Sequence, residues 1–202
     1  MLTPIRLRWE RGESCGSCRQ GVFGLAKKRA AVVLDVEFTA WDGSLARNWS
    51  LSREHKEVVQ IGAVKLDAET LAIRDEFEIL VQPRVNPILS DYLVVLTGIS
   101  NERLAREGVD FISAYRAFLN FSGDAQICAW GRDDKIFAEN LALYGWQGCM
   151  PLLPYYDVSE LYRAQGIDTT GKRACDAGPL AGVPFEGKQH DGLDDARGVA
   201  KG

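Results

Sequence analysis

Two carboxylates stand inside an apolar stretch near the start of the chain. The stretch AAVVLDVEF, residues 30–38, otherwise consists of aliphatic, β-branched and aromatic residues, which are typical of a strand covered on both faces. Asp35 and Glu37 are two positions apart, so in an extended chain both point to the same face, about 6–7 Å apart at the backbone. Burying two ionised carboxylates is costly unless a cation lies between them. The pattern therefore predicts a divalent-metal site on this strand.

Two further acidic groups follow apolar segments. Asp133 and Asp134 come after ICAW, and Asp194 and Asp195 come shortly after His190. Two divalent ions about 3.5–4 Å apart, the arrangement used in two-metal phosphoryl transfer, need several carboxylates from different elements. A neutral histidine with a pKa near its ordinary value of about 6.5 can accept the proton of an attacking water. These residues predict a two-metal hydrolytic site with a histidine base.

The spacing within the last group predicts where the histidine lies. His190 precedes Asp195 by five residues, which on a regular helix is about 140° around the axis. The side chains of His190 and Asp195 would then point in different directions from the helix axis. We therefore expect His190 on a loop just before the last helix and Asp195 on the helix itself. The chain ends at Gly202, so this helix is short, and we expect either a longer chain or a partner to cover it.

The segments that must position these residues show strand and helix patterns in turn. Strands are predicted over 30–38, 57–66, 76–81 and 125–130, and helices over 110–119, 133–145, 158–166 and 190–202. Pro83 and Pro87 predict a loop that runs to residue 100. Residues 167–189 are rich in Gly and Pro and predict irregular chain with one short helix near 174–182. Asp157 and Glu160 resemble a capping box for the helix over 158–166. The order indicates an α/β fold with a mixed sheet.

The composition is that of a globular protein of one domain. The chain has 202 residues, a net charge of −4 and a pI near 5.3, which argues against coating nucleic acid by bulk attraction. Bound metal ions would still give an acidic protein local positive charge. No apolar run is long enough for a membrane span and no signal peptide is evident, so we expect a cytoplasmic protein without a membrane partner.

The first 29 residues differ from the rest. Residues 1–29 hold seven basic and two acidic side chains and no sustained periodicity, which predicts a loosely ordered basic arm before a domain over 30–202. Cys15 and Cys18 form a CxxC pair in this arm. No second pair follows at zinc-finger spacing, so reduced thiols are favoured over a zinc or redox site.

Three motifs resemble those of a known family. DVE at 35–37, WGRDD at 130–134 and HDGLDD at 190–195 resemble, in order, the three motifs of the DEDDh 3'-5' exonucleases, with support from EVVQIGAVKL at 57–66 and LSDYLVVLTGIS at 89–100. This is the ribonuclease-H-like group that includes proofreading subunits, ribonuclease T and exonucleases that trim histone mRNA. The resemblance implies a five-stranded mixed sheet, with the second strand antiparallel to the others, flanked by α-helices.

The resemblance also implies roles for the acidic residues. Asp35, Glu37, the acid of the second motif and Asp195 would be the ligands of two Mg²⁺ or Mn²⁺ ions, and His190 the general base. The second acid is either Asp133 or Asp134. Asp133 shares a helical face with the apolar residues expected to pack on the sheet, so it is favoured, with Asp134 as the alternative.

The implied activity is removal of nucleoside 5'-monophosphates from single-stranded or overhanging 3' ends of RNA or DNA. Phe38 and Trp41 follow the first motif and could stack on terminal bases, although Phe38 is equally well explained as core. Leu96, Thr97 and Gly98 match a loop that wedges against the 3'-terminal nucleotide in the family. A catalytically inactive nucleic-acid-binding module is the alternative. That alternative predicts a substituted ligand, and none is missing.

Overall fold

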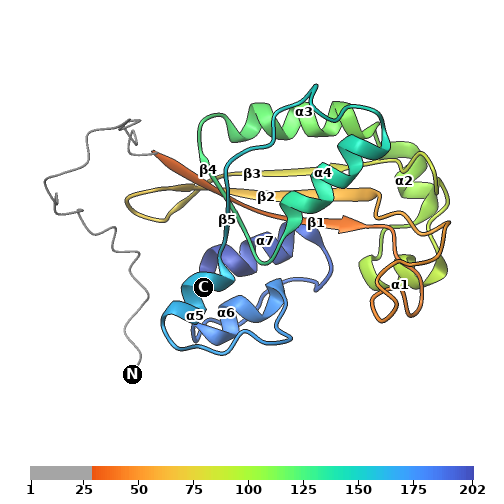
Figure 1. The fold of residues 1–202 in the computed structure, drawn as a ribbon. Helices are drawn as coiled ribbons and strands as arrows, with labels where there is room; N and C mark the ends of the chain where they lie inside the picture. The colour runs from red at the N-terminus through yellow and green to blue at the C-terminus, as the bar shows by residue number, and fades with distance from the viewer. Residues whose placement is uncertain (1–28) are drawn as a thin grey trace, which may run out of the picture.

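The computed structural model describes residues 29–202, in which five strands form one mixed sheet with helices on both faces (Figure 1). The strands are β1 (Ala30–Phe38), β2 (Val58–Asp67), β3 (Ile73–Leu80), β4 (Gln126–Ala129) and β5 (Tyr155–Asp157), in the order β3-β2-β1-β4-β5. β2 is antiparallel to β1 and β3, whereas β4 pairs parallel with β1 and with β5. The predicted fold class is confirmed. Cys15, Cys18 and all but the last residue of the basic arm predicted over 1–29 lie outside the described residues.

Helices cover both faces of this sheet. They are α1 (Asp91–Thr97), α2 (Asn101–Glu107), α3 (Phe111–Ser122), α4 (Asp133–Leu143), α5 (Ser159–Ala164), the 3-10 turn η1 (Ala174–Asp176), α6 (Ala177–Leu180) and α7 (Gly192–Lys201). α3 and α4 lie on one face, and α5, α6 and α7 lie on the other (Figure 1). No helix of the described residues is long and apolar enough to cross a membrane.

The alternation of side chains along β1 decides which face receives the acids. Val32, Leu34 and Val36 belong to the core cluster shared with α3 and α4, whereas Val33 belongs to the cluster shared with α7. Since side chains of a strand alternate between faces, Asp35 and Glu37 share the face of Val33. The two acids of β1 therefore point toward the α7 side of the sheet.

Helix α1 occupies part of the segment predicted as a loop from Pro83 to residue 100, so that prediction is wrong there, and α2 follows directly after that segment. Ser90 begins α1 and Ser100 begins α2, because each hydroxyl accepts a hydrogen bond from a backbone N–H three residues on. Gly98 ends α1 in a left-handed conformation, with φ of 72°. The prolines end regular pairing after β3, but both lie before the first cap and leave the helices intact.

Smaller differences occur at element ends. β3 begins at Ile73, three residues earlier than predicted, and the three-residue β5 carries too short a pattern to be recognised. The predicted capping box does not form, because Asp157 lies in β5 and its carboxylate accepts hydrogen bonds from the backbone N–H and the hydroxyl of Ser159. Elsewhere, the helices predicted around 110–119, 133–145, 174–182 and 190–202 are all found.

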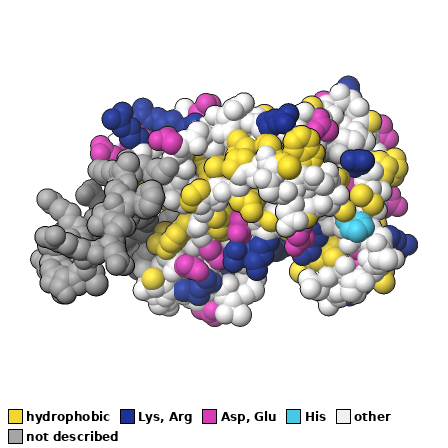
Figure 2. Space-filling view, turned by 45° about the horizontal axis from the view of Figure 1, so that its top comes forward, with side chains coloured by type: hydrophobic (Ala, Val, Ile, Leu, Met, Phe, Trp, Pro, Cys, Tyr) yellow, Lys and Arg dark blue, Asp and Glu magenta, His cyan; other side chains and the backbone are white. Residues whose placement is uncertain are grey.

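The visible surface carries charges of both signs. Figure 2 shows Lys and Arg side chains interspersed with Asp and Glu over one face, with apolar side chains between them. This distribution agrees with the low net charge of the chain. On this face, attraction of nucleic acid would therefore be local rather than spread over a continuous basic surface.

Candidate active site

The acids of β1 are held close to other carboxylates. Glu37 is buried and Asp35 is half-buried, and they pair across the sheet with Gln60 and Gly62 of β2. Burial raises the pKa of Asp35 well above its ordinary value, and the nearby charges of other acids, that of Asp133 first, raise it further. Burial and the neighbouring Asp195 raise the pKa of Glu37 to about 8. Without a cation, this group therefore holds protons that exposed carboxylates would have released.

Asp133 joins this group from the first turn of α4. α4 is fixed to the sheet by the fully buried Asn140, whose Oδ1 accepts from Val58 N at 3.0 Å and whose Nδ2 donates to Lys56 O at 2.7 Å. Burial and the adjacent Asp134 raise the pKa of Asp133 to about 8. The apolar stripe that the sequence predicted for this helix is buried, which turns Asp133 inward.

Asp134 lies in a different environment. Its two carboxylate oxygens accept hydrogen bonds from Arg132, at 2.8 Å from Nε and 2.6 Å from Nη2. This pairing lowers the pKa of Asp134. The arrangement favours Asp133 over Asp134 as the acid of the second motif, and the assignment of a ligand role stays a prediction.

The start of α7 lies directly against the sheet because two glycines allow close approach. A Cβ at Gly62 would overlap the backbone of Gly192 and Leu193, and a Cβ at Gly192 would lie 3.1 Å from Asp35 O. The fully buried Gln60 locks this contact, since its Oε1 accepts from Gly192 N at 2.9 Å. Sequence reasoning missed these three residues. The available signal was a glycine and an amide inside an otherwise apolar strand.

Asp195, on α7, and His190, which precedes the N-cap of α7, complete the group. Asp191 caps α7, His190 precedes it with φ of 61°, and His190 N donates to Asp195 Oδ2 at 2.9 Å. His190 Nδ1 lies 4.0 Å from Glu37 Oε1, and Glu37, His190 and Asp195 each place one potential ligand atom within 4.8 Å of the others. Burial raises the pKa of Asp195 to about 6. The histidine lies on the loop before the helix, as its spacing predicted.

Two buried oxygen atoms show what the group lacks. Among the described residues, Asp133 Oδ2 and Asp195 Oδ1 are buried side-chain atoms without a hydrogen-bond partner. Buried polar atoms are almost always satisfied, and unpaired carboxylate oxygens are especially costly. Carboxylates with one imidazole nearby form a donor set suited to hard divalent cations. The residues present therefore fit a divalent metal.

Two basic residues flank the acidic group, and sequence reasoning did not identify either of them. Arg173 Nη1 lies 3.1 Å from His190 Nε2, and the Lys188 ammonium lies where a Cβ of Gly98 would be. Burial, and then the charges of Arg173 and Lys188, lower the pKa of His190. The imidazole is therefore neutral near pH 7, as a proton acceptor must be.

Comparison with known proteins places this geometry in a family. Residues 32–201 match the RNase T exonuclease family model. The chain belongs to the RNase T family of exonucleases. Its three acidic motifs and histidine identify it with the DEDDh type of 3'-5' exonucleases, which confirms the predicted resemblance. Divalent metal dependence is implied by this family and agrees with the acidic cluster.

Individual members of the RNase T family are distant in sequence. The chain is 25% identical to ERI1 exoribonuclease 2 of Xenopus laevis, over 84% of this chain and 27% of that protein. It is 25% identical to the 3'-5' exonuclease Snipper of Drosophila melanogaster, over 83% of this chain and 66% of that protein. The chain thus spans about a quarter of the length of the exoribonuclease 2 proteins that it matches.

Solved structures share the fold. A 3'-exonuclease that recognises the 3' end of the histone mRNA stem-loop superposes with a TM-score of 0.71 at 19% identity, covering 86% of this chain and 79% of that one. The nuclease domain of 3'hExo, a DEDDh family member bound to rAMP, gives a TM-score of 0.69 at 19% identity, covering 87% and 90% of the two chains. At this identity, the likeness establishes the fold of the RNase T family alone.

The side chains predicted to bind substrate have mixed environments. Phe38 packs partly against the core and against Trp49, with ring centroids 5.5 Å apart. Trp41 is half-buried, and its backbone N–H donates to the Ser44 hydroxyl at 2.6 Å.

The turn after α1 shows a similar division. Leu96 lines a shallow apolar pocket, while Thr97 is buried and its hydroxyl donates to Leu93 O at 2.9 Å. Gly98 contacts Lys188, which places this turn beside the His190 loop. Thr97 therefore has a clear structural role. The substrate contacts predicted for the five residues Phe38, Trp41, Leu96, Thr97 and Gly98 remain predictions.

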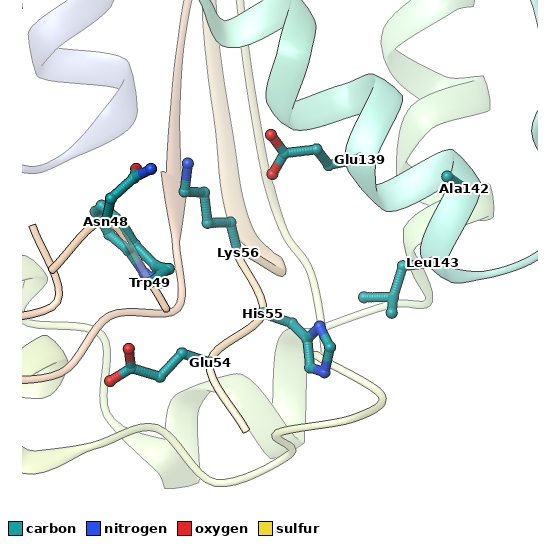
Figure 3. A pocket seen from close by; sticks show the side chains of 8 residues that line it. All are labelled: Asn48, Trp49, Glu54, His55, Lys56, Glu139, Ala142 and Leu143. Carbon is teal, nitrogen blue, oxygen red and sulfur yellow. The ribbon is translucent and has the colours of Figure 1, made fainter. Parts of the chain in front are cut away.

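The long loop between β1 and β2 forms a separate pocket with helix α4. A cavity of about 510 Å³ lies between the two. Figure 3 shows the side chains that line it, which are those of Asn48, Trp49, Glu54, His55, Lys56, Glu139, Ala142 and Leu143. Lys56 Nζ lies 4.8 Å from the centre of the Trp49 ring. The acids of the candidate active site do not line this pocket. Trp49 connects the two regions, because its ring also packs against Phe38 at the end of β1.

Proposed function

We propose that the protein is a 3'-5' exonuclease that releases nucleoside 5'-monophosphates from single-stranded or overhanging 3' ends. The observation that supports this most directly is the meeting of Asp35, Glu37, Asp133 and Asp195 beside His190, with two buried oxygens unpartnered. Because every position of the DEDDh set is filled, an active nuclease is favoured over an inactive binding module. Relatives named exoribonucleases make RNA the first substrate to test, with DNA as the alternative.

In the proposed mechanism, the four acids would hold two Mg²⁺ or Mn²⁺ ions. The bound ions would neutralise the phosphodiester, lower the pKa of water and stabilise the leaving oxygen. His190 accepts a proton from the attacking water at Nε2. Its Nδ1 faces Glu37, so a proton on Nδ1 lies next to a carboxylate that favours this tautomer. The water oxygen forms the new bond to phosphorus, the bond to the 3' oxygen of the shortened strand breaks, and that oxygen takes a proton from solvent.

A 5'-labelled single-stranded RNA or DNA oligonucleotide tests this function. Incubation with Mn²⁺ should give a ladder of shortened strands, and EDTA should abolish it. Asp35→Ala should also abolish the ladder, since the acid lies at the centre of the charged group. If neither RNA nor DNA is shortened, or if Asp35→Ala shortens them as fast as the wild type, the proposed function is wrong.

His190→Ala should lower the hydrolysis rate by about 10²- to 10³-fold while Mn²⁺ binding is retained. The reason is that the imidazole can serve as base, whereas four acids remain to hold the metal. The single-turnover rate and Mn²⁺ titration calorimetry measure the two effects. His55→Ala is the matched control, because His55 lines the loop pocket and is the only other histidine of the chain. An unchanged rate for His190→Ala would exclude the general-base role.

A further inference from the structure

Arg173 makes a contact that the proposed mechanism does not explain. Its Nη1 lies 3.1 Å from His190 Nε2. A guanidinium has donors only and stays protonated, so Nε2 must be the acceptor in this hydrogen bond. The lone pair that a general base needs is therefore occupied by Arg173 in the free protein.

The backbone around Arg173 is fixed, while its side chain is exposed. Arg173 N donates to Asp176 Oδ2 at 2.9 Å, and Asp176 N donates back to Arg173 O at 2.9 Å. The indole of Trp130 donates to Lys172 O at 3.0 Å, which ties this turn to the end of β4 beside the second motif. Since Arg173 itself is exposed, its guanidinium can exchange partners by rotamer change without movement of the backbone.

The charges around the site favour such an exchange. The charge of Arg173 acts on both His190 and Asp195, so a positive charge lies at the edge of the site, where it attracts the phosphates of a nucleic acid. When a water that has given its proton to His190 attacks a phosphodiester, the non-bridging oxygens of that phosphodiester must lie near the imidazole. A guanidinium at this place can donate two parallel hydrogen bonds to a phosphate, whereas a neutral imidazole nitrogen can accept only one. The phosphate is therefore the better partner for Arg173.

We propose that Arg173 binds the phosphate of the 3'-terminal nucleotide and thereby releases the base. In the free protein the guanidinium donates to His190 Nε2, and in the complex it donates to the phosphate, so that Nε2 is free to accept a proton from water. This inference rests on the proposed exonuclease function. It makes phosphate binding a condition for activating the base.

Arg173→Met, Arg173→Lys and the wild type are compared by two measurements with Mn²⁺ present. In steady-state hydrolysis of a single-stranded oligonucleotide, Arg173→Met should raise KM by about tenfold or more, with a smaller effect on kcat, and Arg173→Lys should lie between. In calorimetry, Arg173→Met should weaken AMP binding by a similar factor and leave adenosine binding unchanged. The control is Arg74→Met, because Arg74 pairs with Asp67 at the opposite end of β2. It should match the wild type.

The outcomes separate this proposal from simpler roles. If Arg173→Met lowers kcat with KM and AMP affinity unchanged, the residue only positions His190 and the phosphate role is wrong. If no parameter changes, the contact has no role and the proposal is also wrong. Calorimetry with AMP does not depend on turnover. If the wild type shortens no strand, the exonuclease proposal fails, while loss of AMP affinity in Arg173→Met would still identify the phosphate ligand.

Discussion

Asp133→Asn is expected to lower the rate of 3'-end hydrolysis by about a thousandfold or more, while Asp134→Asn stays near the wild-type rate. The two residues are adjacent, yet their surroundings differ. Asp133 Oδ2 is buried without a partner, and burial raises the pKa of this carboxyl to about 8. An amide in its place has one oxygen and no charge, so it would bind a divalent cation weakly.

Asp134→Asn serves as the matched control for this prediction. Asp134 pairs with Arg132 near the surface, and such pairs contribute only about 0–1 kcal/mol to stability. Single-turnover rates and Mn²⁺ titrations should be measured for both variants, with thermal melting to show that both are folded. If Asp134→Asn loses the activity and Asp133→Asn keeps it, the second acid has been assigned to the wrong residue.

The part of the site that depends on local periodicity was predictable from the sequence. Asp35 and Glu37 share a face because strand side chains alternate. Asp133 turns inward because Ile136 and Phe137, three and four residues further along α4 and so on the same helical face, are buried. The spacing predicts His190 before α7, since five residues do not return to the same helical face, and the residue after His190, Asp191, is the N-cap of this helix. Each of these inferences needed only the sequence within one element.

The contacts that assemble the site could not be found in this way. Gln60 bonds to Gly192, 132 positions away, and the link exists only because β2 pairs in a register that places Gln60 opposite Glu37. Arg173 reaches His190 from a turn within an irregular, glycine-rich segment. No pattern along the chain records such contacts, since they depend on how distant elements pack.

Removal of divalent metal should make the stability of the protein fall as pH rises. Burial and neighbouring charges raise the pKa values of Glu37 and Asp133 to about 8, against ordinary values near 4 in the unfolded chain. Between pH 4 and 8 the folded state therefore binds more protons than the unfolded state, so the free energy of unfolding decreases with increasing pH. His190, whose pKa is lowered, acts in the opposite direction, but its effect is complete near pH 7.

Thermal melting in EDTA at pH 7 and pH 9 measures this effect, and Tm should fall by about 5–10 °C across the interval. Mn²⁺ should raise Tm more at pH 9 than at pH 7, because the ion replaces protons that have already dissociated at the higher pH. Asp133→Asn removes one of the two acids with pKa near 8, so its Tm should depend less on pH and respond less to Mn²⁺. Asp134→Asn should keep the wild-type slope. A metal-free Tm that is constant or rises from pH 7 to pH 9 would show that these carboxyls are ionised in the folded protein and that the group is held together without protons or metal.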